Sequence, residues 1–206
     1  MNGYTTLLKA SCETFTERKS VFTGSASPVE TEREALDFIS AVKSRYSDAT
    51  HNVWAYTLRD GNLTRFSDDG EPHGTAGLPV LDTLRKPGIT NAVIVVTRYF
   101  GGILLGAGGL VRAYSKAASL AVNASGTAFI ETLTRVKLSL SYSDNARIET
   151  LLAAFPHSNP SVSYASGVEI EFLMRSNDIP LLSSKLADAT AARAVLSVVG
   201  EEYGNL

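Results

Sequence analysis

The sequence NAVIVVTRYFGGILLGAGGLVRAYSKAASLAV, residues 91–122, contains the change of pattern that decides the fold. Its early part, residues 93–96, is an unbroken run of β-branched residues, which predicts a strand buried on both faces. Residues 101–109 then contain five glycines, although each glycine weakens a regular element by about 0.5–1 kcal/mol. From Leu110 onward, apolar residues recur at helical spacing. The stretch therefore predicts a strand, a glycine-rich loop and a helix.

A glycine-rich loop that leads into a helix suggests an anion-binding site. The free N–H groups and the dipole of a helix N-terminus favour an anion, and glycines let a phosphate approach the backbone. Arg98 lies before the loop, and Arg112 and Lys116 lie one helical turn apart after it. The residues predicted to bind phosphate or nucleic acid are Arg98, Gly101, Gly102, Gly106, Gly108, Gly109, Arg112 and Lys116.

Neither common nucleotide-binding motif is present in this loop. A P-loop needs Lys-Ser or Lys-Thr after its last glycine, whereas Leu110 follows Gly109, and the dinucleotide pattern counted from Gly106 fails at Val111. The alternative interpretation is that Gly106, Gly108 and Gly109 only permit close packing of the helix on the strand. The basic residues would then form an ordinary solvated face. Both interpretations stay open from the sequence.

A second polar loop, residues 67–77 with the sequence SDDGEPHGTAG, carries three carboxylates. Asp68, Asp69 and Glu71, with His51 from an earlier segment, are a candidate supporting or metal site, because carboxylate oxygens bind divalent cations. The spacing matches no ion-loop template, so we favour carboxylates that cap backbone N–H groups or pair with Arg98. The metal is unspecified and no cofactor is expected. No catalytic residue is assigned, because no Ser or Cys nucleophile stands beside an Asp69–His51 dyad.

Several motifs in order resemble the IMPACT family and its bacterial YigZ branch. They are DATHN at residues 48–52, WAY at 54–56, the 67–77 loop and VVTRYFGGILLGAGGLVRAY at 95–114. The resemblance covers about residues 15–125. It implies an N-terminal domain with a left-handed β-α-β crossover, similar to a ribosomal-protein domain and to domain IV of elongation factor G. It also implies a small C-terminal domain similar to domain V of that factor.

The same resemblance carries an expectation about function. Eukaryotic members of the family are linked to restraining a kinase that responds to uncharged tRNA. For the bacterial branch, the family implies no established activity. The 206-residue length fits the bacterial two-domain form and leaves no room for the extra ubiquitin-ligase-like domain of the eukaryotic members.

Charge and composition limit the classes of partner. The chain is 44% hydrophobic and 19% charged, as in an ordinary globular protein. Up to residue 128 there are 13 Lys and Arg against 12 Asp and Glu, a net charge of +1, and from residue 129 there are 6 against 9, a net charge of −3. A broadly basic nucleic-acid-binding domain is therefore excluded, and any RNA contact must come from a local patch.

The cysteine count and the N-terminal segment indicate the compartment. Cys12 is the only cysteine, which excludes an internal disulfide and a cysteine-based zinc site. The polar start Met1-Asn2-Gly3-Tyr4 lacks the order of a signal peptide, and the apolar runs are shorter than the ~20 residues of a spanning helix. We expect a cytoplasmic, soluble monomer without membrane contact.

The N-terminal part of the chain is predicted to alternate strands and helices. Thr31 and Glu34 form a capping box that opens a helix over residues 31–45. Asp60-Gly61-Asn62 is the strongest hairpin signal in the chain. The other predicted elements are strands at 4–10, 13–26, 51–59 and 63–66, with a polar break at 17–19, and a helix that ends near Lys86.

The pattern restarts after a small, polar segment at residues 123–127, which is the best linker candidate. The predicted strands are 135–142, 161–165, 168–175 and 194–201, and the predicted helices are 145–155 and 179–189. This β-α-β-β-α-β order is the ferredoxin-like plan. We therefore predict an α+β protein with an IMPACT-like N-terminal domain at residues 1–126 and a ferredoxin-like C-terminal domain at residues 130–206.

Three functions are compatible with these observations. We favour a non-catalytic protein that binds RNA or nucleotide phosphate through the glycine loop and acts in translation or its regulation. Its partners would be RNA, the ribosome, a nucleotide or a translation-related protein. The second is a magnesium-dependent, phosphate-handling enzyme with Asp68 or Asp69 as base or magnesium ligand. The third is a regulator that binds only proteins, which the low basicity favours.

Overall fold

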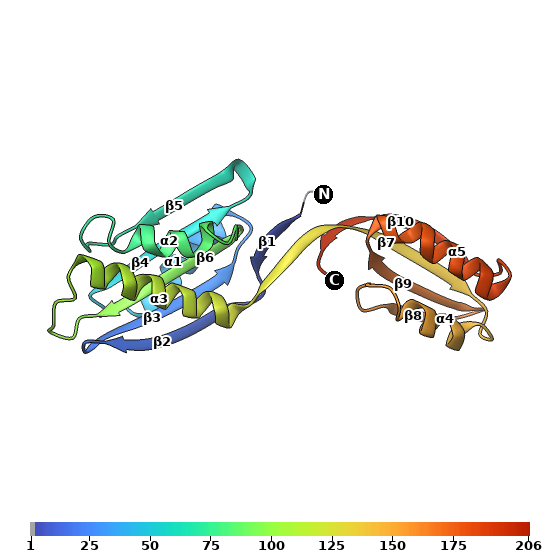
Figure 1. Cartoon of the computed structure of the whole chain (residues 1–206), viewed down its shortest axis with the longest axis horizontal. Helices are drawn as coiled ribbons and strands as arrows, with labels where there is room; N and C mark the ends of the chain where they lie inside the picture. The colour runs from blue at the N-terminus through green and yellow to red at the C-terminus, as the bar shows by residue number, and fades with distance from the viewer. Residues whose placement is uncertain (1–2) are drawn as a thin grey trace. The chain divides into compact units, whose positions relative to one another are not determined.

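The computed structural model describes residues 3–206, which form two compact units, Tyr4–Phe129 and Ile130–Leu206 (Figure 1). Met1 and Asn2, part of the polar start noted above, lie outside the described residues. Each unit packs helices on an antiparallel sheet, which confirms the α+β class. Among the described helices, none is long and apolar enough to cross a membrane.

The N-terminal unit is built on a sheet in the order β2-β3-β6-β4-β5. Strand β6 is central, and its pairing with β3 and with β4 is antiparallel. The strands of this unit are β1 (Tyr4–Leu7), β2 (Ser11–Glu17), β3 (Ser20–Pro28), β4 (His51–Leu58), β5 (Leu63–Ser67) and β6 (Ala92–Tyr99). Its helices are α1 (Glu32–Arg45), α2 (Gly77–Arg85) and α3 (Ala107–Ser125), with a short 3-10 turn at Asp60–Asn62.

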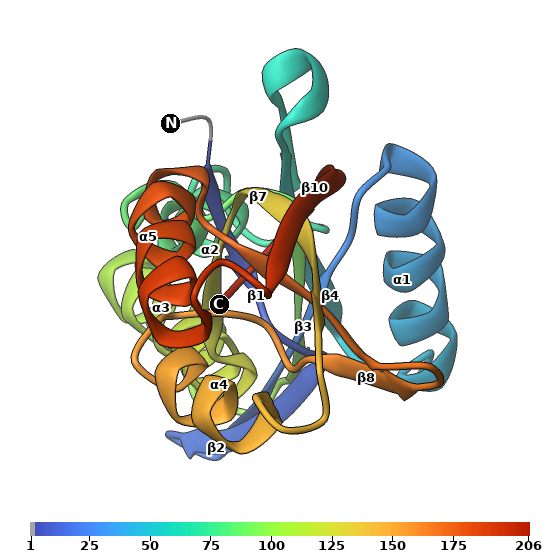
Figure 2. The same ribbon diagram turned by 90° about the vertical axis from the view of Figure 1, so that its right-hand side faces the viewer.

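Helices cover both faces of this sheet. Val93 and Val95 of β6 belong to the cluster under α1, whereas Ile94 and Val96 belong to the larger cluster under α2 and α3. Figure 2 shows α1 on the side of the strands away from α2 and α3. The strand is therefore buried on both faces, as its continuous β-branched run predicts.

The connections of the sheet include an unusual crossover. Strands β3 and β4 are both antiparallel to β6, which lies between them, so they are parallel to each other and are joined through α1. Strands β5 and β6 flank β4 in the same way and are joined through α2. The crossover from β5 to β6 runs across the sheet in the direction opposite to the crossover from β3 to β4, and its strands point the opposite way. Its helix α2 lies on the opposite face of the sheet from α1. The two crossovers therefore have opposite hands, and one is left-handed, against the usual right-handed rule.

The C-terminal unit has the ferredoxin-like plan that periodicity predicts. Its own strands lie in the order β10-β7-β9-β8, and each neighbouring pair is antiparallel, while β7, which begins before the unit boundary, also pairs with β1. Apolar residues of β7 and β9 alternate inward and pack under both helices. The elements are β7 (Thr127–Leu140), α4 (Asn145–Leu152), β8 (Ser161–Tyr164), β9 (Val168–Met174), α5 (Ile179–Thr190) and β10 (Val195–Gly204), with a 3-10 turn at Ser176–Asp178.

The predicted linker at residues 123–127 is wrong. Asn123 and Ser125 lie in the last turn of α3, Gly126 ends the helix at a φ of 68°, and β7 begins at Thr127. Ser125 is 1% exposed, and its hydroxyl donates a hydrogen bond to the Lys9 carbonyl. Small polar residues therefore serve here as a packed helix end, and β7 continues through the boundary between the units.

Candidate functional site

Three strands bring one aromatic and two polar side chains together at the end of the N-terminal sheet. Arg98 of β6 pairs in register with Phe22 of β3 and with His51 of β4. Residues opposite each other in a sheet lie on the same face. This face is the one that α3 covers, since Phe22 and Tyr114 of α3 belong to the same core cluster.

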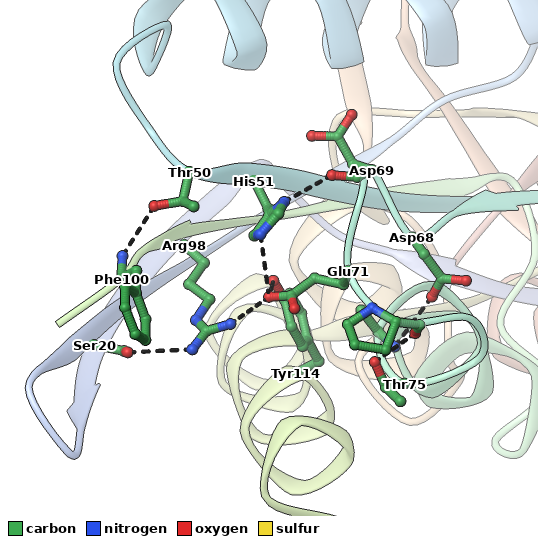
Figure 3. A network of polar contacts seen from close by, with 12 residues as sticks. Ser20, Thr50, His51, Asp68, Asp69, Glu71, Thr75, Arg98, Phe100 and Tyr114 are labelled. Atoms are coloured by element: carbon green, nitrogen blue, oxygen red, sulfur yellow. Dashed lines mark hydrogen bonds and ion pairs between the residues drawn. The ribbon is translucent and has the colours of Figure 1, made fainter. Parts of the chain in front are cut away.

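Glu71, from the 67–77 loop, is the centre of a buried polar network (Figure 3). Its Oε1 accepts from Arg98 Nη1 at 2.5 Å and from the Tyr114 hydroxyl at 2.7 Å. His51 Nε2 lies 3.8 Å from the same oxygen. The side chains of Arg98 and Glu71 are only 6% and 4% exposed. The positive charge of Arg98 is therefore balanced by the Glu71 carboxylate inside the protein.

The contacts of Tyr114 and His51 show which of their atoms donate hydrogen bonds. Burial, together with the charge of Glu71 and its hydrogen bond, raises the pKa of Tyr114 far above its ordinary value, so its hydroxyl stays protonated and donates. His51 Nδ1 lies 2.8 Å from the Asp69 carbonyl oxygen. Because a carbonyl only accepts, Nδ1 carries a proton and donates it in this contact.

The two aspartates of the loop are occupied by backbone and lysine donors. Asp68 accepts from the N–H groups of Gly74, Ala76 and Gly77 at 2.8–3.1 Å. Burial opposes ionisation of Asp68, but these backbone donors outweigh it and lower its pKa. Asp68 therefore caps backbone N–H groups, as the interpretation of the loop carboxylates as caps predicts.

Asp69 accepts from the Asn52 N–H at 2.6 Å and from Lys43 Nζ at 2.7 Å. Glu71 is the carboxylate that pairs with Arg98. Within residues 3–206, no three His, Cys, Asp or Glu side chains are grouped so as to hold a metal ion. Both carboxylates hold the loop in place through these donors, and the use of Asp68 or Asp69 as a magnesium ligand or base stays a prediction.

A cavity of about 380 Å³, which we name the apolar cavity, lies beside the polar network. Polar side chains form one wall and hydrophobic side chains form the remainder. The polar wall consists of Thr50, His51, Glu71 and Arg98, and the apolar walls consist of Pro72, Phe100, Leu104, Leu105, Ala107 and Leu110, with Gly106.

A second cavity of about 240 Å³, which we name the basic pocket, lies along α3. It contains three cationic side chains and one carboxylate. Its lining residues are Phe15, Glu17, Arg18, Leu105, Gly109, Arg112, Ala113 and Lys116. Leu105 lines both cavities.

The structure separates the basic residues that were predicted to form one surface. Arg112 and Lys116 line the basic pocket, but Arg98 lines the apolar cavity and is neutralised by Glu71. The role of Arg98 in anion binding stays a prediction, and the structure places its side chain in a different cavity from Arg112 and Lys116. Arg18 takes its place in the basic pocket, and sequence reasoning missed it. The only available signal was the polar break at 17–19, which is the turn between β2 and β3.

The glycines of the loop differ in what they do. Gly102 and Gly106 have φ angles of 82° and 70°, which favour glycine, and a Cβ on either would meet nothing within 4 Å. A Cβ on Gly101 would lie 2.0 Å from the Lys19 carbonyl carbon, so Gly101 permits a close approach. The close contact of helix with strand occurs elsewhere, since a Cβ on Gly24 of β3 would lie 2.3 Å from the Ala117 oxygen.

The first turn of α3 faces Arg112. The Leu110 N–H donates to the Gly106 oxygen at 2.9 Å, and the earlier N–H groups of a helix have no partner within it. A Cβ on Gly108 would lie 3.6 Å from Arg112 Nη1. The Arg112 guanidinium therefore reaches back toward the helix start. A Cβ on Gly109 would lie 3.0 Å from Leu105 Cβ, so glycine at this position permits the close approach of Leu105, the residue that lines both cavities.

The chain is similar to several known proteins. The profile described as the Impact N-terminal domain matches residues 18–122. IMPACT family member YvyE of Bacillus subtilis (strain 168) is 34% identical over 195 residues, which cover 94% of this chain and 90% of that protein. IMPACT family member YigZ of Escherichia coli (strain K12) is 34% identical over 170 residues, 81% of this chain and 83% of that protein.

Two further similarities differ in how much of the chain they cover. A Dictyostelium discoideum protein named Protein IMPACT homolog is 41% identical over 100 residues, which cover 46% of this chain and 28% of that protein. A crystal structure titled as that of a hypothetical protein covers 98% of this chain and 100% of its own, with 31% identity and a TM-score of 0.61.

Proposed function

The chain belongs to the IMPACT family, and from this premise we propose that it binds RNA through phosphate in the basic pocket and acts in translation or its regulation. The observation that carries the proposal is the meeting of Arg18, Arg112 and Lys116 in one pocket. These residues come from the β2–β3 turn and from α3. Cationic side chains that converge on a cavity beside a helix start favour a phosphate.

The cations of the basic pocket are available to a ligand. Within residues 3–206, none of Arg18, Arg112 and Lys116 forms an ion pair with a carboxylate. Lys116 Nζ lies over the Phe15 ring, 4.5 Å from its centroid, which leaves the ammonium its charge. Glu17 is the one carboxylate in the lining. The pocket thus has a net positive charge in a chain whose total formal charge is −2.

The size of this patch sets the expected strength of binding. Three cations neutralise at most about three phosphates, and for single strands each contributes about 0.7 to the slope of log K against log salt. We therefore expect modest affinity with a slope of about −2. Tight binding of the kind that broadly basic domains achieve does not fit the overall charge.

The biological setting is proposed from the family. Family resemblance connects the eukaryotic members to a kinase that responds to uncharged tRNA, and it implies that the N-terminal unit is similar to ribosome-associated domains with a left-handed crossover. The enzyme alternative has less support, because Asp68 and Asp69 are engaged with backbone and lysine donors. We therefore favour binding over catalysis.

The test is a salt titration of RNA binding with two matched lysine variants. Fluorescence anisotropy of a labelled oligoribonucleotide is measured for the wild type, Lys116→Ala and Lys185→Ala. Lys116 lies over Phe15 and Lys185 over Phe155, so each variant removes one lysine that rests on a phenylalanine ring. We expect Lys116→Ala to weaken binding about fivefold and to reduce the salt slope by about 0.7.

Lys185→Ala, in α5 of the C-terminal unit, is expected to bind like the wild type. Thermal melts of all three proteins establish that each is folded. Equal losses in both variants, or binding that ignores salt, would contradict the phosphate site and leave the protein-binding regulator as the better interpretation.

A further inference from the structure

The apolar cavity is not used by phosphate binding, yet it adjoins the basic pocket at Leu105. We propose that it accepts a nucleobase of the bound RNA, and that the base carries an exocyclic amino group. This inference rests on the proposed function, because it extends the phosphate site to the next group along the same strand. A base and its phosphate are joined through one ribose, so two adjoining cavities match the two ends of a nucleotide.

The walls of the cavity suit a flat ring. Its volume of about 380 Å³ lies in the range of about 300–1,000 Å³ that small-molecule sites occupy. Phe100 and Leu104 are 45% and 82% exposed at its rim, although both are large and hydrophobic. Unstacked bases are bound by stacking on aromatic side chains and on arginine planes. Phe100 offers such a surface, with the Arg98 guanidinium carbon 5.4 Å from its ring centroid.

The polar wall offers one acceptor and one donor. With Nδ1 donating to the Asp69 carbonyl, the neutral form of the His51 imidazole offers Nε2 as an acceptor. Arg98 Nε is buried and has no hydrogen-bond partner in the part of the chain that the structure describes. A turn of the exposed Phe100 ring onto the base would open this donor. The exocyclic amino group would then donate to His51, and the ring nitrogen or carbonyl beside it would accept from Arg98.

This polar wall separates a base from the other candidate occupant, a hydrophobic side chain of a partner protein. A leucine or phenylalanine side chain would cover His51 Nε2 and would leave Arg98 Nε without a hydrogen-bond partner. Leaving buried polar groups unpaired opposes binding. A base fills the apolar volume and also satisfies these atoms, so the cavity fits a base better.

The experiment compares labelled oligoadenylate, oligouridylate and an abasic ribose-phosphate oligomer of the same length. Anisotropy titrations are carried out with the full chain at one fixed salt concentration. We expect oligoadenylate to bind about tenfold more tightly than the abasic oligomer, as stacking of a base provides. Oligouridylate, which has no exocyclic amino group, should lie between them.

Two variants test the cavity itself. Leu104→Ser changes an 82% exposed side chain, so the fold is retained, and it should weaken oligoadenylate binding severalfold while leaving abasic binding unchanged. Its matched control is Leu181→Ser, at a leucine of α5 that is 55% exposed, which should change neither. His51→Ala should remove the preference for oligoadenylate over oligouridylate.

The outcomes distinguish the base site from the phosphate site. Equal binding of the abasic oligomer and oligoadenylate, with binding by Leu104→Ser unchanged, would overturn the base site but keep the phosphate site. A hydrophobic side chain of a partner protein would then be the better occupant of the apolar cavity. Failure of the phosphate site would appear differently, as Lys116→Ala binding the abasic oligomer as well as the wild type does. Selective loss of oligoadenylate binding in Leu104→Ser, with abasic binding kept, supports the inference.

Discussion

The two units hold their charged side chains in different ways. In the N-terminal unit, the Arg98–Glu71 pair lies inside the protein, with side chains 6% and 4% exposed. In the C-terminal unit, Lys137 and Glu169 form a pair whose side chains are 32% and 46% exposed. Among the described residues of that unit, every ion pair leaves its basic partner at least 32% exposed.

This contrast indicates which unit holds the functional site. An exposed pair contributes little, because water already solvates both charges. A buried pair is weak evidence for stability, since removing both charges from water is costly. A buried ion pair beside an apolar cavity gives that cavity a polar wall at a fixed position. Only the N-terminal unit combines a buried pair with a cavity and a basic pocket among the described residues.

The largest expected effect comes from breaking the buried pair. Arg98→Met leaves the Glu71 carboxylate buried without its cation, so the free energy of unfolding should fall by about 3–5 kcal/mol. Adding Glu71→Gln should recover a large part of that loss, because no unpaired charge remains. Urea denaturation monitored by far-UV circular dichroism measures both. Lys137→Met in the C-terminal unit is the control and should leave the midpoint within error.

If Lys137→Met were as damaging as Arg98→Met, the distinction between buried and exposed pairs would fail. A double variant no more stable than Arg98→Met would instead mean that the loss comes from the contact of the Arg98 guanidinium with the Phe22 and Phe100 rings.

A smaller effect is expected where the units differ in helix-to-strand packing. Gly24→Ala puts a Cβ at 2.3 Å from the Ala117 oxygen of α3, so the helix must shift. Overpacking of this kind costs about 1–3 kcal/mol. Gly200→Ala in β10 is the matched control, because a Cβ there meets nothing within 4 Å. Thermal melts compare the two, and a Gly24→Ala protein as stable as the wild type would show that α3 moves freely.

The smallest effect concerns the carboxylate caps. Burial opposes ionisation of Asp68, but backbone donors from Gly74, Gly77 and Ala76 lower its pKa. Its ionised form therefore stabilises the fold above the ordinary pKa of 3.8, and this stabilisation is lost as the pH falls through the lower folded value. Asp68→Asn should cost about 1 kcal/mol at neutral pH.

The cost of Asp68→Asn should shrink in acid, which urea denaturation at pH 7 and near pH 3 measures. Asp144 of the C-terminal unit provides the comparison, because a side-chain hydrogen bond from Ser141 and then Arg193 lower its pKa. Asp144→Asn should change stability less than Asp68→Asn. A cost of Asp68→Asn that stays constant with pH would show that the charge of Asp68 does not matter for the cap.

Local signals in the sequence predicted much of the fold. The predicted cap at Thr31 is present, with the Glu34 N–H donating to Thr31 Oγ1 at 3.2 Å, but the Glu34 carboxylate accepts from the Glu30 N–H at 2.7 Å in place of the Thr31 N–H of a strict capping box. The β-branched run became the doubly buried strand β6, and the period of the C-terminal half predicted the ferredoxin-like order. These features depend on residues within a few positions of one another, so periodicity and capping suffice.

The composition of the site was decided by the tertiary structure. The 67–77 loop offers Arg98 three carboxylates in the sequence. Only the folded loop shows that Arg98 pairs with Glu71 rather than with Asp68 or Asp69. Arg18 joins Arg112 only because β2, β3 and α3 pack together. Gly24 is needed only because α3 crosses β3 at that point. Sequence patterns report the conformation that a residue prefers, whereas ion pairs and close contacts between distant residues depend on the packing of the whole unit.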